Sequence, residues 1–133
     1  PLKKKSFFSL QKRINFSSKL VSKVNRIKIE TYDDIIKSSK TINLVKYLKK
    51  KYKKSEIFFL IGSDNLIKFH KWHDWKKISN FCKIIVFPRT GYLKQVFNSK
   101  AYGYLGKEKI QFIKSKRINI SSSKIRKNYL KYN

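Results

Sequence analysis

Short apolar runs alternate along the chain with stretches in which apolar residues recur every three or four positions. The continuous apolar runs are residues 57–61 and 83–87, and each ends at a glycine or a proline. Weaker strand patterns cover residues 26–31 and 110–113. Continuous apolar runs are typical of parallel strands that are covered on both faces, so the pattern predicts a buried parallel sheet.

Helical stripes lie between these runs. Phe7, Leu10, Ile14, Val21 and Val24 predict a first helix. A second stripe runs from Leu44 to Tyr52, with Thr41 as its expected N-cap. Residues 66–78 indicate one broken or two short helices, and residues 121–130 a last one, whereas the segment between the third and fourth strands is expected to be a loop.

This order of elements predicts an α/β fold with a doubly wound, Rossmann-like parallel sheet in a single domain over residues 1–133. Such sheets normally open with a strand whose following loop binds the ligand, but this sequence begins with a helical pattern. The chain also has no methionine. We therefore expect that the first strands of the fold are missing from the sequence.

The net charge of +27 first suggests a nucleic-acid partner. However, only five of the 34 basic residues are arginine, the side chain that reads bases and phosphates bidentately. The chain is also rich in residues that AT-rich codons encode, so a general base bias explains the charge without a nucleic-acid partner. The positive field would still attract a phosphorylated substrate.

Neither a membrane span nor a secretory signal is found in the sequence. The one cysteine, Cys82, allows no internal disulfide and is expected to be a buried, inert thiol. These features fit a cytoplasmic protein.

A group of serines near the C-terminus is a candidate anion site. Ser121, Ser122 and Ser123 begin the last predicted helix, and Arg126 follows Ser122 by four residues, on the same helix face. Free backbone N–H groups at a helix start favour phosphate. Local chemistry alone favours an ordinary serine cap.

Two further candidates follow predicted strands. Gly62 would let a ligand approach the backbone, and Asp64 would accept from a ribose hydroxyl or cap a helix. Arg89 follows the next strand and would either meet a phosphate or occupy a surface turn. Ligands of open α/β sheets bind at these carboxyl ends.

Histidines and tryptophans follow the glycine segment. His70 and His73 would need a third ligand to hold a metal, and the sequence has no other histidine, so no protein metal site is expected. Trp72 and Trp75 are either core residues or, if one is exposed, a stacking platform for an aromatic ring.

Taken in order and spacing, these motifs resemble bacterial nicotinate-nucleotide adenylyltransferases, over essentially the whole chain. The blocks that carry the resemblance are Pro1-Leu2-Lys3, Ser39-Lys40-Thr41, Gly62-Ser63-Asp64-Asn65, Phe69-His70-Lys71-Trp72, Arg89-Thr90-Gly91-Tyr92 and Ile120-Ser121-Ser122-Ser123-Lys124-Ile125-Arg126.

The resemblance implies adenylyl transfer from ATP, with Mg²⁺, to nicotinate mononucleotide, which gives deamido-NAD and pyrophosphate in NAD biosynthesis. It implies an ATP site formed by Ser121, Ser122, Ser123, Arg126, Gly62 and Asp64. It implies a nicotinate mononucleotide site formed by Thr41, Trp72, Lys3 and Arg89. A homo-oligomer is a further possibility, and neither a nucleic acid nor a membrane is an expected partner.

The family opens with a glycine-rich turn and a His-x-Gly-His signature, which this sequence does not contain. By comparison with the family layout, roughly 35 to 45 residues would be missing before Pro1. The resemblance therefore implies that no catalytic residue is present, that the 133 residues are inactive alone, and that their unpaired strand edges impair folding.

Two other functions stay open at this stage. One is adenylyl transfer to another small phosphate such as phosphopantetheine, by the same fold. The other is a small basic RNA-binding protein, which would need arginines and exposed aromatic residues gathered on one face. A remnant of a decayed gene without activity is the third possibility.

Overall fold

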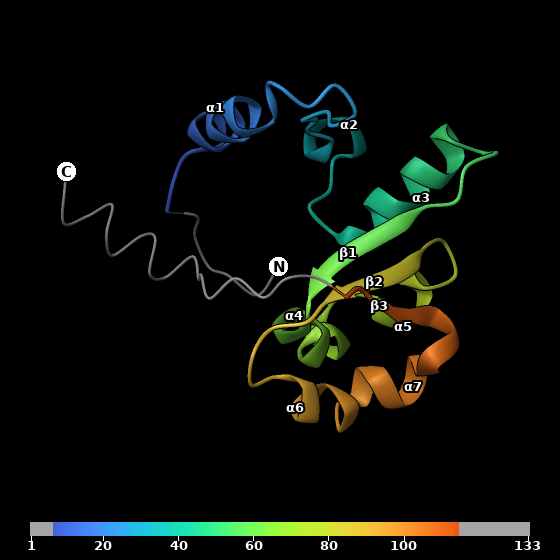
Figure 1. Cartoon of the computed structure of the whole chain (residues 1–133). Coiled ribbons are helices and arrows are strands. Elements are labelled where there is room, and N and C mark those ends of the chain that lie inside the picture. The colour runs from blue at the N-terminus through green and yellow to red at the C-terminus, as the bar shows by residue number, and fades with distance from the viewer. Residues whose placement is uncertain (1–6, 115–133) are drawn as a thin grey trace.

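The computed structural model describes residues 7–114 (Figure 1). The helices are α1 (Leu10–Val21), α2 (Asp33–Ile36), α3 (Thr41–Lys51), α4 (Ser63–Ile67), the 3-10 helix η1 (Phe69–Lys71), α5 (Trp75–Ile78), α6 (Leu93–Phe97) and α7 (Lys100–Lys109). The strands are β1 (Phe58–Gly62), β2 (Lys83–Phe87) and β3 (Ile110–Phe112).

The three strands form one sheet in the order β1-β2-β3, and both pairs are parallel. Gly62 pairs with Phe87, and Val86 pairs with Phe112. The sequence analysis placed all three strands to within one residue at either end. The expected α/β class with a parallel sheet is confirmed.

Helices cover one face of this sheet. α4 contacts β1 and β2, α7 contacts β3, and α3 joins the same layer through α5. Ile61, Ile84 and Val86 point into this layer and are almost fully buried. They pack with the fully buried Leu66 and Phe69, so the core lies between the sheet and the helices (Figure 1).

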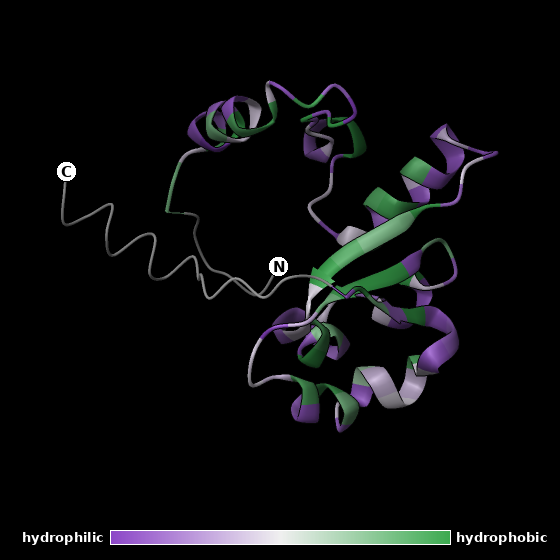
Figure 2. Cartoon of the chain, in the orientation of Figure 1, coloured by the Kyte–Doolittle hydropathy of each residue, from purple (hydrophilic) through white to green (hydrophobic). Residues whose placement is uncertain are grey.

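The opposite face of the sheet is apolar but uncovered in the described residues. Successive side chains of a strand alternate between faces, so Phe58 and Leu60 share this face with Phe87. Their exposed fractions are 44%, 54% and 38%. Figure 2 shows the hydrophobic colour along β1. The expectation of strands covered on both faces is therefore wrong for residues 7–114, because no described helix packs there.

The first helix has the predicted position and no packed face. Ser9 caps α1 by accepting a hydrogen bond from the N–H of Lys12, at 3.2 Å. α1 buries none of its residues, and it stands apart from the sheet (Figure 1). Its predicted stripe follows helical spacing at Leu10, Ile14 and Val21, but none of these three side chains is buried.

Two segments differ from the prediction. Residues 26–31 are not a strand, because a strand needs a neighbouring strand for its N–H and C=O groups and this segment pairs with none in the described chain. The predicted loop before β3 contains α6 and α7 instead. Ser99 caps α7 by accepting from the N–H of Tyr102, and Ala101 is fully buried.

Candidate functional site

The carboxyl ends of β1 and β2 bring three of the predicted residues together. β1 ends at Gly62 and α4 begins at the next residue, Ser63. Because Gly62 pairs with Phe87, the chain that leaves β1 and the chain that leaves β2 start side by side. Asp64 and Arg89 therefore lie next to each other although 25 positions separate them in the sequence.

An ion pair joins these two side chains. The Nη1 atom of Arg89 donates to the Oδ2 atom of Asp64 at 3.0 Å. The side chain of Arg89 is 52% exposed and that of Asp64 is 30% exposed, so solvent reaches both. A solvated ion pair contributes about 0–1 kcal/mol to stability. The ion pair therefore contributes little to the stability of the fold. Its effect is to keep one hydrogen-bond acceptor and one cation close together.

Gly62 is required by the close approach of Asp64. A Cβ atom at this position would lie 2.5 Å from the Oδ1 atom of Asp64 and 3.4 Å from the Nε atom of Arg89. That Oδ1 atom is shielded from solvent and has no hydrogen-bond partner. A buried acceptor without a partner costs free energy, so a hydrogen-bond donor to this oxygen would be favourable.

Asp64 is not a helix cap. The N-cap of α4 is Gly62, whose extended backbone (φ −78°, ψ 154°) makes no side-chain cap, and Asp64 is the second residue of the helix. The capping interpretation of Asp64 is wrong for this reason, and its carboxylate faces Arg89 instead. α4 also begins at Ser63, ahead of residues 66–78, for which the sequence pattern indicates helix.

Trp72 and Trp75 differ in their environments. Trp72 follows η1 and is half-buried, with its ring 5.2 Å from that of Phe69 and 6.0 Å from that of Phe59, between centroids. Trp75 is only 9% exposed and packs in the core. Of the two, Trp72 has the ring with open surface.

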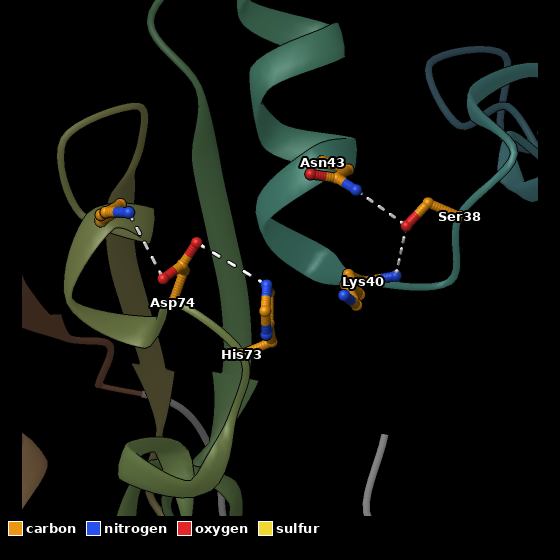
Figure 3. Close-up of polar contacts among 6 residues, drawn as sticks. Ser38, Lys40, Asn43, His73 and Asp74 are labelled. Carbon is orange, nitrogen blue, oxygen red and sulfur yellow. Dashed lines mark hydrogen bonds and ion pairs between the residues drawn. The ribbon is translucent and has the colours of Figure 1, made fainter.

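Thr41 is the first residue of α3 and is half-buried, and the N-cap is Lys40. The predicted capping role of Thr41 is therefore wrong. Ser38 organises this turn instead, because its Oγ atom accepts from the N–H of Lys40 at 3.2 Å and from the amide of Asn43 at 2.9 Å (Figure 3). Among residues 7–114, no hydrogen bond or ring contact joins Thr41 to Trp72 or to the Asp64 and Arg89 pair.

The histidines make local contacts. The Nδ1 atom of His70 lies 3.0 Å from the carbonyl oxygen of Ile67. His73 is exposed, and its Nε2 atom lies 3.7 Å from the Oδ2 atom of Asp74 (Figure 3). Among residues 7–114, no group of three or more His, Cys, Asp or Glu side chains could hold a metal ion.

Cys82 is a buried free thiol, as expected. Its Sγ atom lies 3.3 Å from the carbonyl oxygen of Ile78, to which the thiol donates. Burial raises the pKa of this thiol from 9.0 to about 11, because the thiolate would lose its hydration. A thiol of this kind is a poor nucleophile at neutral pH.

Five of the predicted residues lie outside the described part of the chain: Lys3, Ser121, Ser122, Ser123 and Arg126. One residue of the cluster was missed. Ser63 is fully buried, and its Oγ atom accepts from the backbone N–H of Arg89 at 2.9 Å. The only sequence signal was a hydroxyl placed between Gly62 and Asp64, which does not by itself predict burial. None of the described helices has the length and apolarity to cross a membrane.

Comparison with protein families matches residues 1–128 to the cytidylyltransferase-like family, and the chain belongs to this family. Within it, the chain falls among the nicotinate-nucleotide adenylyltransferases. It is 45% identical over 127 residues to a protein of Pelagibacter ubique named probable nicotinate-nucleotide adenylyltransferase, which matches 96% of this chain and 70% of the relative. A protein of Aquifex aeolicus with the same name is 39% identical, over 92% of this chain and 76% of the relative.

Solved structures show the same fold. Plasmodium falciparum nicotinic acid mononucleotide adenylyltransferase, described as complexed with APC, superposes with a TM-score of 0.65 at 18% identity. The same enzyme described as complexed with NaAD gives a TM-score of 0.64 at 19% identity. The matches cover 90% and 92% of this chain, and 61% and 62% of those chains.

Proposed function

We propose that this chain binds ATP and nicotinate mononucleotide and acts in the adenylyl transfer that gives deamido-NAD and pyrophosphate, in NAD biosynthesis. The observation that carries the proposal is the cluster of Gly62, Asp64 and Arg89 at the carboxyl ends of two neighbouring parallel strands. This edge is where open α/β sheets bind their ligands. The named relatives support the choice of substrates.

In this reaction an oxygen of the nicotinate mononucleotide phosphate attacks the α-phosphorus of ATP. A new P–O bond forms, and the bond from the α-phosphorus to the oxygen that bridges to the β-phosphate breaks. Pyrophosphate leaves with that electron pair. The chemistry needs no covalent bond to the protein, so the contribution of the protein is to position the reactants and to stabilise charge.

Each residue of the cluster then has a role that its chemistry supports. The Asp64 carboxylate, whose side chain is partly exposed, accepts hydrogen bonds from the adenosine ribose. Gly62 leaves room for the Asp64 carboxylate beside the backbone, and we assign it to the ATP site together with Asp64. The exposed guanidinium of Arg89 donates hydrogen bonds to the phosphate of nicotinate mononucleotide.

The pyridine end would lie against Trp72, whose half-buried ring offers a face for stacking. The backbone around Thr41 and Trp72 would meet the nicotinate carboxylate. Outside the described residues, we assign the ATP phosphates to Ser121, Ser122, Ser123 and Arg126, and a supporting phosphate contact to Lys3.

Magnesium enters this proposal as part of the MgATP substrate, because Mg²⁺ keeps most of its ligands from phosphates and water. Among residues 7–114, the cluster offers one carboxylate, Asp64, and that group already faces Arg89. These residues do not fit a magnesium site built by the protein alone, so we assign the ion no protein ligand.

We further propose that the 133 residues act as one domain in the cytoplasm, where Cys82 stays a free thiol. The sequence contains no His-x-Gly-His motif, whose histidines would stabilise the transferring group. The chain alone is therefore expected to bind the nucleotides without releasing pyrophosphate at the rate of an intact enzyme.

Calorimetric titration of the chain with deamido-NAD tests the proposal, since this product fills both halves of the site. We expect saturable binding with one ligand per chain. Dephospho-coenzyme A tests the phosphopantetheine alternative, and a single-stranded RNA at low and high salt tests the RNA-binding alternative. Tighter binding of either than of deamido-NAD, or no binding of deamido-NAD, would contradict the proposal.

A further inference from the structure

Ser63 is one of two polar side chains that the described residues bury, the other being Ser79. Ser63 has no exposed surface, whereas its neighbour Asp64 is partly exposed. A buried hydroxyl needs a hydrogen-bond partner. The partner of Ser63 is the backbone N–H of Arg89, which donates to its Oγ atom at 2.9 Å.

This hydrogen bond joins the two turns that carry the cluster. Ser63 is the first residue of α4 directly after β1, and Arg89 lies two residues after Phe87, the last residue of β2. The guanidinium of Arg89 returns to Asp64, the residue next to Ser63, at 3.0 Å. The result is a closed ring that runs through the backbone of α4, the ion pair and the main chain of Arg89.

The two connections of this ring differ in strength. The ion pair is solvated and the Arg89 side chain is long and flexible, so the pair alone fixes little. The bond to Ser63 has an ordinary length of 2.9 Å and a fully buried acceptor residue, and its donor is the main chain of Arg89 rather than the end of a side chain. Ser63 therefore fixes the backbone position from which the Arg89 side chain extends. The ion pair only orients the guanidinium at the end of that side chain.

We propose that Ser63 is a positioning residue for nucleotide binding: its hydroxyl fixes the main chain of Arg89 and so keeps the guanidinium within reach of both Asp64 and the substrate phosphate. Without that hydroxyl, the N–H of Arg89 would have to find water, and the turn after β2 would shift to let it do so. The inference rests on the proposed function, because it assigns the phosphate to Arg89.

The test is a double-mutant cycle on deamido-NAD binding, measured by calorimetry on the full chain beside its melting temperature. Ser63→Ala should raise the dissociation constant roughly five- to ten-fold, the typical effect of one lost hydrogen bond. In an Arg89→Ala background the same change should have almost no further effect, because the side chain that Ser63 positions is gone. Ser79→Ala, which removes a buried hydroxyl remote from the cluster, should change the constant less than two-fold.

Ser63→Cys serves where Ser63→Ala does not fold, since it keeps a similar volume and replaces the oxygen with a weak acceptor. The same loss of binding is expected for it. Equal binding by wild type and the Ser63 variant would overturn the inference. So would a Ser63 substitution that weakens binding as much in the Arg89→Ala background as it does in wild type. A wild-type chain that binds no deamido-NAD overturns the proposed function and this inference with it, whereas normal wild-type binding with an unaffected Ser63 variant overturns the inference alone.

Discussion

The Nη1 atom of Arg89 lies 3.0 Å from the Oδ2 atom of Asp64, so the turn after β2 touches the first turn of the helix that follows β1. Both residues lie just beyond the carboxyl ends of their strands. These two strand ends lie side by side, because Gly62 pairs with Phe87. One anionic and one cationic group thus meet at the place where this class of sheet binds ligands.

The account predicts that Asp64→Ala impairs binding much more than stability. Deamido-NAD should bind at least about ten-fold more weakly, because hydrogen bonds to a carboxylate are worth roughly 1.5–3 kcal/mol. The free energy of unfolding should change by no more than about 1 kcal/mol, since the lost ion pair is solvated. Calorimetry and urea unfolding measure the two quantities. A variant that binds like wild type would remove Asp64 from the site.

Gly62→Ala should disrupt the cluster without any change of charge. The new Cβ atom would stand 2.5 Å from the Oδ1 atom of Asp64, so that carboxylate must turn away and leave Arg89. We expect a loss of deamido-NAD binding similar to that of Asp64→Ala. Gly103→Ala is the matched control, because that glycine lies in α7 with open space around it. This control should bind normally and gain about 0.5–1 kcal/mol of stability.

Trp72 should report on ligand binding by its fluorescence. The chain has two tryptophans, and only Trp72 is assigned to the nicotinate ring. Deamido-NAD should quench the emission of wild type and of Trp75→Phe, after correction for absorbance by the ligand, and should leave that of Trp72→Phe unchanged. Quenching that persists in Trp72→Phe would place the pyridine ring elsewhere.

Cys82 should make stability depend on alkaline pH. Burial raises its pKa from 9.0 in the unfolded chain to about 11 in the fold, so the unfolded state loses its thiol proton first. The stability is therefore complete below pH 9 and falls as the pH rises toward 11, by about 1.4 kcal/mol for each pKa unit. Thermal unfolding of wild type and Cys82→Ala across this range isolates the effect. Parallel curves for the two proteins would contradict it.

The open face of the sheet should make the chain self-associate. Phe58 and Leu60 expose apolar side chains on β1, an edge strand of the described sheet. Leu60→Lys should lower the association seen by sedimentation velocity at rising concentration. Ile35→Lys is the control, since Ile35 is also more than half exposed but lies on α2. An equal effect of both substitutions would show that general charge, not this face, is responsible.

The sheet was predictable because local pattern determines it. The continuous apolar runs that end at Gly62 and Pro88 give β1 and β2, since short runs rich in isoleucine, valine and phenylalanine favour strands. Residues 26–31 show the limit of that signal. Alternation indicates a strand only if a partner strand lies beside it, and the sequence of the segment itself does not contain that information.

The sequence predicts which residues form the candidate site but not the hydrogen bonds that join them. Gly62 ends one strand, and Asp64 and Arg89 follow strand ends closely, so the topology alone brings the three together. The bond from Arg89 to Ser63 depends on how two turns pack across 26 positions, which no local spacing encodes. α6 and α7 were missed for a related reason, because their apolar stripe is split over two short helices and crossed by Gly103 and Gly106.

The most direct test of the central claim is to map deamido-NAD on the chain by backbone amide NMR. We predict that the largest shift changes fall on Gly62, Ser63, Asp64 and Arg89, with a further change at the indole N–H of Trp72. Changes centred instead on the lysine-lined surface around Lys76 and Lys109, or no saturable change anywhere, would contradict the account.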